Sequence, residues 1–377
     1  MATYPNKLIE AFASQALKVF YMKSVSDAIT NSDYEGQIKD TSSILNVLTF
    51  GKLSAQNYTG ADMTAQDLTE SNAQLITDQK KYFYFKVKDW DTFRSYIKNP
   101  ENTIVEQVGN EIKKVVDTFV LGFVSDVAAG NRIGTDYTTG TVEIAATTGA
   151  VTGTGTTFTS AMVGKGFKAA GQSKWYRVKT FTDATHIVIE NDVDDLGFAD
   201  PFTGAPVTVG GYDGGAIAAG ATYIVQANTA LTVTKSTIFQ YMTQAAATLT
   251  NAEIPYDNRF MVVPADIAAL IRQAPEFISQ GTESGRTAVL NGMLSGQFAG
   301  FNVYEVSDDR ITGNATDGYR CLGGHKSAIC FAMGLVRNQV EQDIIGNFGK
   351  AYKSLYVYGA KVADERRKAL VELFIKA

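Results

Sequence analysis

The sequence predicts an α+β fold that carries an inserted all-β domain. Three observations predict it: an aromatic strand that is followed at once by a long amphipathic helix, a Gly- and Thr-rich middle with short alternating runs and almost no helical periodicity, and a final segment that again mixes helices and strands. At 377 residues the chain can hold two or three domains, each able to bury a core.

The first two segments are an N-terminal arm, residues 1–39, and an extended loop with its strands, residues 40–98. A polar stretch runs from 40 to 80. It begins with Ile44, Val47, Leu48 and Phe50 but has few apolar residues spaced to form a core of its own. A loop of this length without structure is uncommon inside a compact domain, so we expect a hairpin arm that rests on a neighbouring subunit.

The strand after this arm covers residues 81–88. Phe83, Phe85 and Val87 share one face at the period of two that a half-buried strand shows. Its exposed aromatics could stack nucleic-acid bases, but no basic groove accompanies them. We therefore expect the aromatic residues to form sheet core and contacts between subunits.

A long helix, which we call the spine helix, is predicted within residues 99–136. Asn99 can cap it and Pro100 suits its first turn. Apolar residues recur every three or four positions over roughly 27 residues, or about 40 Å: Ile104, Val108, Ile112, Val115, Phe119 and Phe123. This stripe, Phe119 included, should pack on the aromatic strand.

Residues 137–225 form the inserted β domain, because the composition changes at both ends and short alternating runs are separated by Gly, Asn and Asp. The clearest strands are expected at 141–144, 175–178 and 186–189. Residues 226–377 then return to helices and strands. A strand at 259–263 runs straight into a helix begun by Pro264, and further strands are expected at 301–306, 327–333, 354–358 and 369–375.

Composition excludes several classes of protein. The net charge is −5 and no basic stripe is present, so tight phosphate-dominated binding to nucleic acid is not expected. No apolar span of about 20 residues predicts a membrane helix, and the N-terminus lacks the features of a secretory signal. The two cysteines, Cys321 and Cys330, are too few for a disulfide framework and should be reduced and buried.

No catalytic, cofactor-binding or metal-binding residue is predicted. His186 lies in an alternating strand run, and His325 lies in a turn where a phosphate loop would need glycine directly before lysine. Ser95 and Lys98 match a common two-position pattern whose companion motifs are absent. The acidic residues Asp192, Asp194, Asp195 and Asp200 depart from the calcium-loop template, so a solvated loop is favoured over a weak oxygen-ligand site.

The succession of segments resembles a tailed-bacteriophage major capsid protein of the HK-ninety-seven type. The resemblance covers residues 1–136 and 226–377 and rests on the order of several pieces: the segment from Asp33 to Ile38, the polar arm, the run from Leu75 to Phe83, the long helix ending near Val120, the turn at Pro264, the stretch from Gly296 to Val303, and Tyr358 to Val362. The insert is similar to small β modules that recur in phage virion proteins.

The resemblance implies a phage major-capsid fold with an N-terminal arm, an extended polar hairpin loop, a spine helix and an axial domain with returning peripheral-domain strands. The insert would lie on the outer surface or at a subunit contact. No long coiled coil precedes the N-terminal helix, so a separate scaffolding protein is expected. Other expected partners are copies of the chain in pentamers and hexamers, a portal protein, decoration proteins and double-stranded DNA, contacted weakly and non-specifically.

We therefore expect a structural coat protein that self-assembles into an icosahedral head around double-stranded DNA, in a virion assembled in the host cytoplasm. Weak contacts would add up to a stable shell through multivalency. Candidate interface residues are Phe50, Tyr58, Met63, Leu68, Arg366 and Arg367, although the basic run at 366–368 is usual for a solvated turn. The alternatives are a tail, fibre or receptor-binding protein that carries a β module, and an enzyme with an unrecognised carboxylate site.

Overall fold

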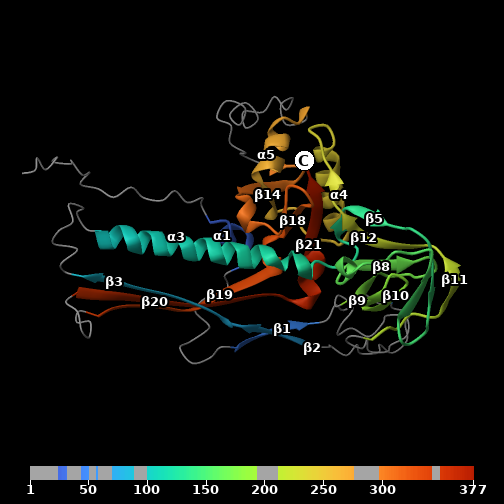
Figure 1. Ribbon diagram of the computed structural model, residues 1–377, viewed down its shortest axis with the longest axis horizontal. Coiled ribbons are helices and arrows are strands. Elements are labelled where there is room, and N and C mark those ends of the chain that lie inside the picture. The colour runs from blue at the N-terminus through green and yellow to red at the C-terminus, as the bar shows by residue number, and fades with distance from the viewer. Residues whose placement is uncertain are drawn as a thin grey trace, which may run out of the picture.

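The computed structural model describes residues 24–31, 44–50, 57, 70–88, 100–192, 211–275, 297–341 and 349–377. Within these residues, the helix α3 runs along a long three-stranded sheet (Figure 1). An eight-stranded sheet with the helices α4 and α5 stands beside one end of α3, and a second eight-stranded sheet extends beyond that end. The mixed architecture with an all-β segment agrees with the α+β fold predicted from the sequence.

The three-stranded sheet has the order β19-β20-β3 and is antiparallel throughout. Its strands are β19 (Ile329–Glu341), β20 (Gly349–Val362) and β3 (Gln79–Lys88). The alternation predicted for β3 is confirmed, since Phe83 and Phe85 are half-buried whereas Tyr82, Tyr84 and Lys86 are exposed. β19 and β20 are much longer than the runs at 327–333 and 354–358 suggested, because β20 pairs with β19 on one side and with β3 on the other, and this pairing extends both strands into more polar sequence.

The spine helix α3 (Pro100–Leu121) continues into a 3-10 turn, η1 (Gly122–Asp126). Its start at Pro100 is as predicted; the expected cap Asn99 lies outside the described residues. Phe119 packs edge-on against Tyr358 of β20, with ring centroids 5.6 Å apart, which confirms that this part of the stripe faces the sheet. The fully buried helix residues are Asp117 and Val120, beside the predicted stripe, and Ile112, Val116 and Leu121 are also buried. The helix packs against the N-terminal segment and the main hydrophobic core as well as against the sheet.

The polar arm has a hairpin stem. β1 (Ile44–Phe50) pairs antiparallel with β2 (Glu70–Ile76), so that Ile44 lies opposite Ile76 and Phe50 lies opposite Glu70. Leu75 of this stem is buried. Apart from residue 57, residues 51–69 lie outside the described part of the chain.

The eight-stranded sheet beside the helices α4 and α5, which we call the axial sheet, has the order β13-β21-β18-β14-β16-β15, with β4 paired to β21 and β17 paired to β18. Its strands are β13 (Leu231–Thr232), β21 (Leu370–Lys376), β18 (Gly318–His325), β14 (Arg259–Pro264), β16 (Phe301–Val306), β15 (Gln297–Phe298), β4 (Arg132–Ile133) and β17 (Gly313–Asn314). The helices α4 (Ile238–Asn251) and α5 (Ala265–Arg272) pack on this sheet, with short 3-10 turns at η4 (Asp308–Arg310), η5 (Lys326–Ala328) and η6 (Asp364–Ala369). The predicted passage from strand to helix at Pro264 is therefore confirmed.

The second eight-stranded sheet has the order β11-β6-β7-β10-β9-β8-β12-β5. Its strands are β11 (Ile217–Ala221), β6 (Thr141–Ile144), β7 (Ala150–Thr154), β10 (His186–Asn191), β9 (Tyr176–Asp183), β8 (Gly166–Ala169), β12 (Tyr223–Thr229) and β5 (Thr135–Tyr137), with a 3-10 turn η2 (Ser160–Met162). A hydrophobic core separate from the main one fills it, built from residues between Val142 and Val225. The three strands predicted in the insert correspond to β6, β9 and β10.

The separate core leads to a test of the insert boundaries, which remain a prediction. Residues 137–225 expressed alone should give a β-type circular dichroism spectrum and a cooperative thermal transition, because the aromatic and aliphatic core of this sheet comes from that range. A random-coil spectrum would show that the segment cannot fold outside the whole chain.

The N-terminal segment is held against the spine helix. α1 (Ser26–Ile29) is a single turn, and Asp117 of α3 lies at its start. The Asp117 carboxylate accepts hydrogen bonds from Ser24 Oγ at 2.8 Å and from the backbone N–H of Ser26 at 3.0 Å. It also receives the guanidinium of Arg310 at 2.6 Å. One buried carboxylate thus joins the N-terminal segment, the spine helix and the axial domain.

Candidate functional site

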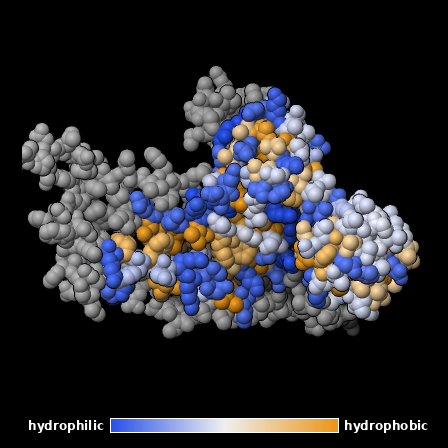
Figure 2. Space-filling model, viewed as in Figure 1, coloured by the Kyte–Doolittle hydropathy of each residue, from blue (hydrophilic) through white to orange (hydrophobic). Residues whose placement is uncertain are grey.

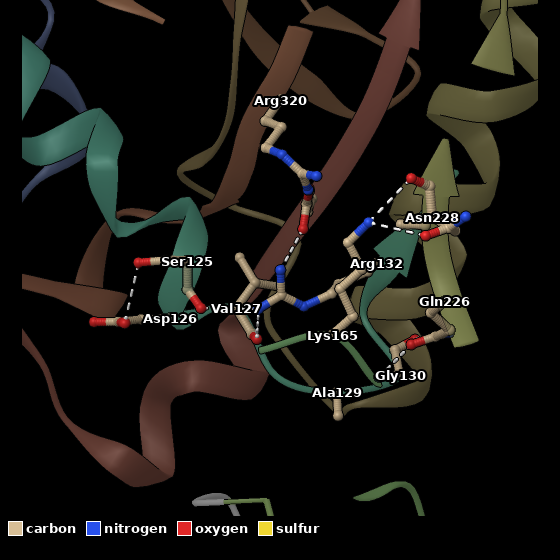
Figure 3. Close-up of polar contacts among 12 residues, drawn as sticks. Ser125, Asp126, Val127, Ala129, Gly130, Arg132, Lys165, Gln226, Asn228 and Arg320 are labelled. Atoms are coloured by element: carbon tan, nitrogen blue, oxygen red, sulfur yellow. Dashed lines mark hydrogen bonds and ion pairs between the residues drawn. The ribbon is translucent and has the colours of Figure 1, made fainter. Parts of the chain in front are cut away.

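The most concentrated charge in the described interior lies where the end of the spine helix, the axial sheet and the insert meet. We call Arg132, Lys165, Arg320 and Glu372 the junction cluster (Figure 3). Arg132 comes from β4, Arg320 from β18 and Glu372 from β21, whereas Lys165 comes from the loop before β8 of the insert. The pairing of β4 with β21 places Arg132 directly beside Glu372.

Glu372 is the only carboxylate within the junction cluster and is fully buried. It accepts a hydrogen bond from Arg132 Nη1 at 2.5 Å through one oxygen and binds Arg320 through the other. The second terminal nitrogen of Arg132 donates to the carbonyls of Ser125 and Val127, each at 2.8 Å. The guanidinium therefore ties the end of the spine helix to the axial sheet (Figure 3).

Lys165 is the member of the junction cluster that belongs to the insert. It is 4% exposed, and its Nζ donates to the backbone carbonyl of Asn228 at 3.0 Å, as Figure 3 shows. The pKa of Lys165 is lowered to about 8, mainly by burial and also by the nearby Arg320 and Arg132, whereas Glu372 partly offsets these effects. Burial is therefore the main reason why the ammonium form is disfavoured, and the two neighbouring arginines add to it.

Four more polar contacts lie at the same junction. The backbone N–H of Gly130 donates to Gln226 Oε1 at 2.7 Å. Arg367 of η6 donates to the carbonyl of Asp126 at 2.6 Å and lies 3.6 Å from Asp192, which in turn accepts from the backbone N–H of Ala129. These contacts fix the orientation of the insert on the axial sheet.

Chemically, this arrangement is suited to holding parts of the chain together rather than to catalysis. The Glu372 oxygens are both occupied by arginines, so the carboxylate has no free position for a general base. Across the described ranges, no group of three or more His, Cys, Asp or Glu side chains could hold a metal ion. The junction cluster is therefore a structural joint.

The depressed pKa of Lys165 gives a pH-dependent stability. The folded-state pKa, about 8, lies below the unfolded value, so the unfolded chain binds more protons between these two values and stability gains from raising the pH through that window. From pH 7 to pH 10, the unfolding free energy of the wild type should rise by about 2 to 3 kcal/mol relative to Lys165→Met. Urea titrations of both proteins at several pH values measure this difference. A difference that stays constant with pH would contradict the assignment.

A second candidate site is the face of the three-stranded sheet that points away from α3. Tyr82 is 76% exposed and Tyr84 is 45% exposed, and Lys86 and Lys353 each lie over the ring of Tyr84, 5.4 and 5.5 Å from its centroid. A hollow of about 580 Å³ on this face is lined by Tyr82, Phe83, Tyr84, Gln339, Lys353, Ser354 and Leu355. Exposed aromatics with neighbouring cations are typical of surfaces that bind another protein.

Of the predicted interface residues, Phe50, Arg366 and Arg367 lie in the described part of the chain. Tyr58, Met63 and Leu68 lie outside the described residues, and Phe50 ends strand β1. Arg366 is half-buried and donates to the carbonyl of Ser327 at 2.6 Å. Arg367 is only 4% exposed, so the expectation of a solvated turn is wrong at this position, because its guanidinium is used within the chain. The subunit interface itself stays a prediction.

The residues weighed for catalysis are also accounted for. His186 is exposed at the start of β10 and contacts Asp183 through the same ring nitrogen that faces Thr185, so no relay through the two nitrogens forms. His325 caps η5, its Nδ1 accepting from the backbone N–H of Ser327. Asp192 is buried, not solvated as expected. Cys321 and Cys330 are buried and form no disulfide, as predicted.

Sequence reasoning missed the junction cluster. Its members are separated by as many as 240 residues, and each occurs in a strand or loop with no local signature. The only available signal was a charged residue inside an otherwise apolar strand, as with Glu372 between Val371 and Leu373.

Comparison with known proteins gives one family and many solved structures. A family model described as "Phage capsid protein" matches residues 181–372, just over half of the chain. No curated protein matches the sequence. None of the helices in the described residues has the length and apolar character needed to cross a membrane.

The chain resembles capsid structures along almost its whole length. The structure from Mycobacterium phage Che8 has a TM-score of 0.58 at 16% identity, with 98% of each chain covered. The capsid of the cyanophage P-SCSP1u has a TM-score of 0.57 at 13% identity, covering 98% of this chain and 94% of that one. The capsid of Ralstonia phage GP4 has a TM-score of 0.54 at 12% identity, covering 99% and 96%. At these identities the likeness establishes the shared fold.

Proposed function

Because the chain belongs to the phage capsid protein family and is a structural coat protein, we propose that its copies form pentamers and hexamers that close into an icosahedral shell around double-stranded DNA. Each copy would bury part of its surface against several others, so that individually weak contacts become strong together. The protein acts by geometry and not by turnover.

Two observations carry this proposal: a hairpin stem in the predicted arm and an open sheet face. The hairpin stem β1–β2 leads into residues 51–69, and the sheet β19-β20-β3 exposes Tyr82, Tyr84 and two lysines. Residues 51–70 contain three acidic side chains and one lysine, so their charge is opposite to that of this face. If the arm of one copy lies on this sheet face of a neighbouring copy, the contact covers the exposed aromatic side chains and brings the opposite charges together.

The role of a coat protein implies further partners besides other copies of the chain. We propose a separate scaffolding protein, a portal protein and decoration proteins, with the insert available on the outer surface or at a subunit contact. DNA contact should be weak and non-specific, because the net charge is −5. The particle would be assembled in the host cytoplasm and the chain would remain in the virion.

Deletion of residues 55–70 tests the arm. The variant should stay folded and soluble but form no shells, because the deletion removes a contact between copies and leaves the three larger sheets in place. Negative-stain electron microscopy of the wild type and the deletion, each expressed alone and with a candidate scaffold, gives the measurement. Normal shells from the deleted protein would exclude the arm as the main contact.

The tail, fibre or receptor-binding alternative is not favoured by the family match, which lies in a capsid family. It also predicts a different particle. Elongated trimers or open rings in the same micrographs would support it, whereas closed shells support the coat protein.

A further inference from the structure

A groove on the spine helix contains two buried polar atoms that nothing in the described structure satisfies. The groove runs between α3 and the sheet, has a volume of about 460 Å³ and is lined by Gln79, Lys81, Glu111, Lys114, Val115, Thr118, Phe119 and Tyr358. The α3 residues recur at intervals of three and four, so they share one face of the helix. Figure 2 shows hydrophobic residues exposed among polar ones along this part of the molecule.

The two polar atoms are Glu111 Oε2 and the Tyr358 hydroxyl. Both are buried, and neither has a hydrogen-bond partner among the described residues. Tyr358 is fully buried, and its ring lies against Phe119. A carboxylate oxygen can only accept hydrogen bonds, so an occupant of this groove must donate to Glu111.

Lysines at the rim do not fill this role. Lys114, which also lines the groove, pairs with Asp309 at 3.6 Å, and Lys81 is exposed on β3. Neither hydrogen-bonds Glu111 Oε2. The rest of the wall combines the polar Gln79 and Thr118 with the apolar and aromatic side chains of Val115, Phe119 and Tyr358.

We propose that the groove binds a guanidinium or ammonium side chain of a second copy of this chain, with Glu111 as its charge partner and the Phe119 and Tyr358 rings beside its apolar stem. A guanidinium fits best, because it carries five donors in one plane and stacks on aromatic faces. We take the occupant to be a second copy because a coat protein packs mainly against itself. This step of the inference rests on the proposed function.

The first test measures the site in the unassembled full-length protein. N-ethylguanidinium, a guanidinium on a short apolar stem, should shift nuclear magnetic resonance signals of groove residues at millimolar concentration, and Glu111→Gln should weaken this binding about tenfold or more. Glu106→Gln, which changes an exposed glutamate on the same helix, is the matched control and should bind like wild type. Equal binding by Glu111→Gln and wild type would overturn the site.

The second test measures its use between copies. Glu111→Gln should raise the protein concentration needed for shell formation about tenfold, with an unchanged melting temperature of the subunit, whereas Glu106→Gln should assemble normally. Wild-type shells together with unchanged assembly of Glu111→Gln would overturn the second copy as occupant while leaving the coat function intact. Absence of wild-type shells under all conditions would instead count against the proposed function. If Lys81→Met destabilises the subunit as a lost ion pair would, Lys81 satisfies Glu111 and the proposal is wrong.

Discussion

Replacing Glu372 by glutamine should lower the free energy of unfolding by about 3 to 5 kcal/mol. Glu372 is fully buried and binds both Arg132 and Arg320. Without its charge, the guanidinium of Arg132, whose side chain is 5% exposed, keeps its charge in the interior with no counter-charge at Glu372. Urea titrations at pH 7, followed by tryptophan fluorescence and circular dichroism, measure the change.

Two further variants show whether charge is the cause. Glu143→Gln alters an exposed residue of β6 and should change stability by no more than about 0.5 kcal/mol. Replacing Glu372 and Arg132 together by methionine should be less harmful than Glu372→Gln alone, because no unpaired charge is left at that pair. A single Glu372→Gln variant as stable as wild type would mean that the junction cluster contributes nothing to the fold.

Replacing Asp117 by asparagine should also cost about 3 to 5 kcal/mol and should free the N-terminal segment. The carboxylate is fully buried and is bonded to Ser24, Val25, Ser26 and Arg310. Asparagine keeps the shape but turns an amide toward the buried guanidinium of Arg310. Amide hydrogen exchange should therefore accelerate at residues 24–30, together with the loss of stability.

Asp309→Asn provides the matched control. Asp309 pairs with Lys114 at 3.6 Å, but its side chain is 75% exposed, so its loss should cost less than about 1 kcal/mol. If Asp117→Asn and Asp309→Asn have equal effects, the buried carboxylate does not hold the N-terminal segment.

Several elements follow from local sequence alone. The alternation around Phe83 and Phe85 predicts β3, and Pro100 with the apolar stripe predicts α3. The change of composition near residue 137 predicts the all-β segment, and the glycines around the short runs separate its strands correctly at β6, β9 and β10. These features depend on backbone preferences and on the period of apolar residues, which a chain displays before it folds.

The lengths of the strands and the roles of charged side chains could not be predicted as well from the sequence. The strand expected at 327–333 extends as far as Glu341, because pairing with β20, and not propensity, sets its end. Arg367 reads as part of a solvated basic turn, yet it is buried against Asp126 and Asp192. A charged residue can be buried only where distant partners meet it, and those partners cannot be read from its neighbours in the chain.

By itself, the sequence determined the α+β class, the spine helix, the aromatic strand, the inserted β segment and, through the order of these pieces, the resemblance to phage coat proteins. Only the tertiary structure decided which charges are paired in the interior and which polar atoms remain unsatisfied. Arg132 and Glu372 form an ion pair although 240 residues separate them in the sequence. Glu111 and Tyr358 line the same groove because α3 packs against β20, which is distant in the sequence. Local patterns record how each segment prefers to fold, whereas electrostatic partnership depends on distances in space that exist only after the segments have packed.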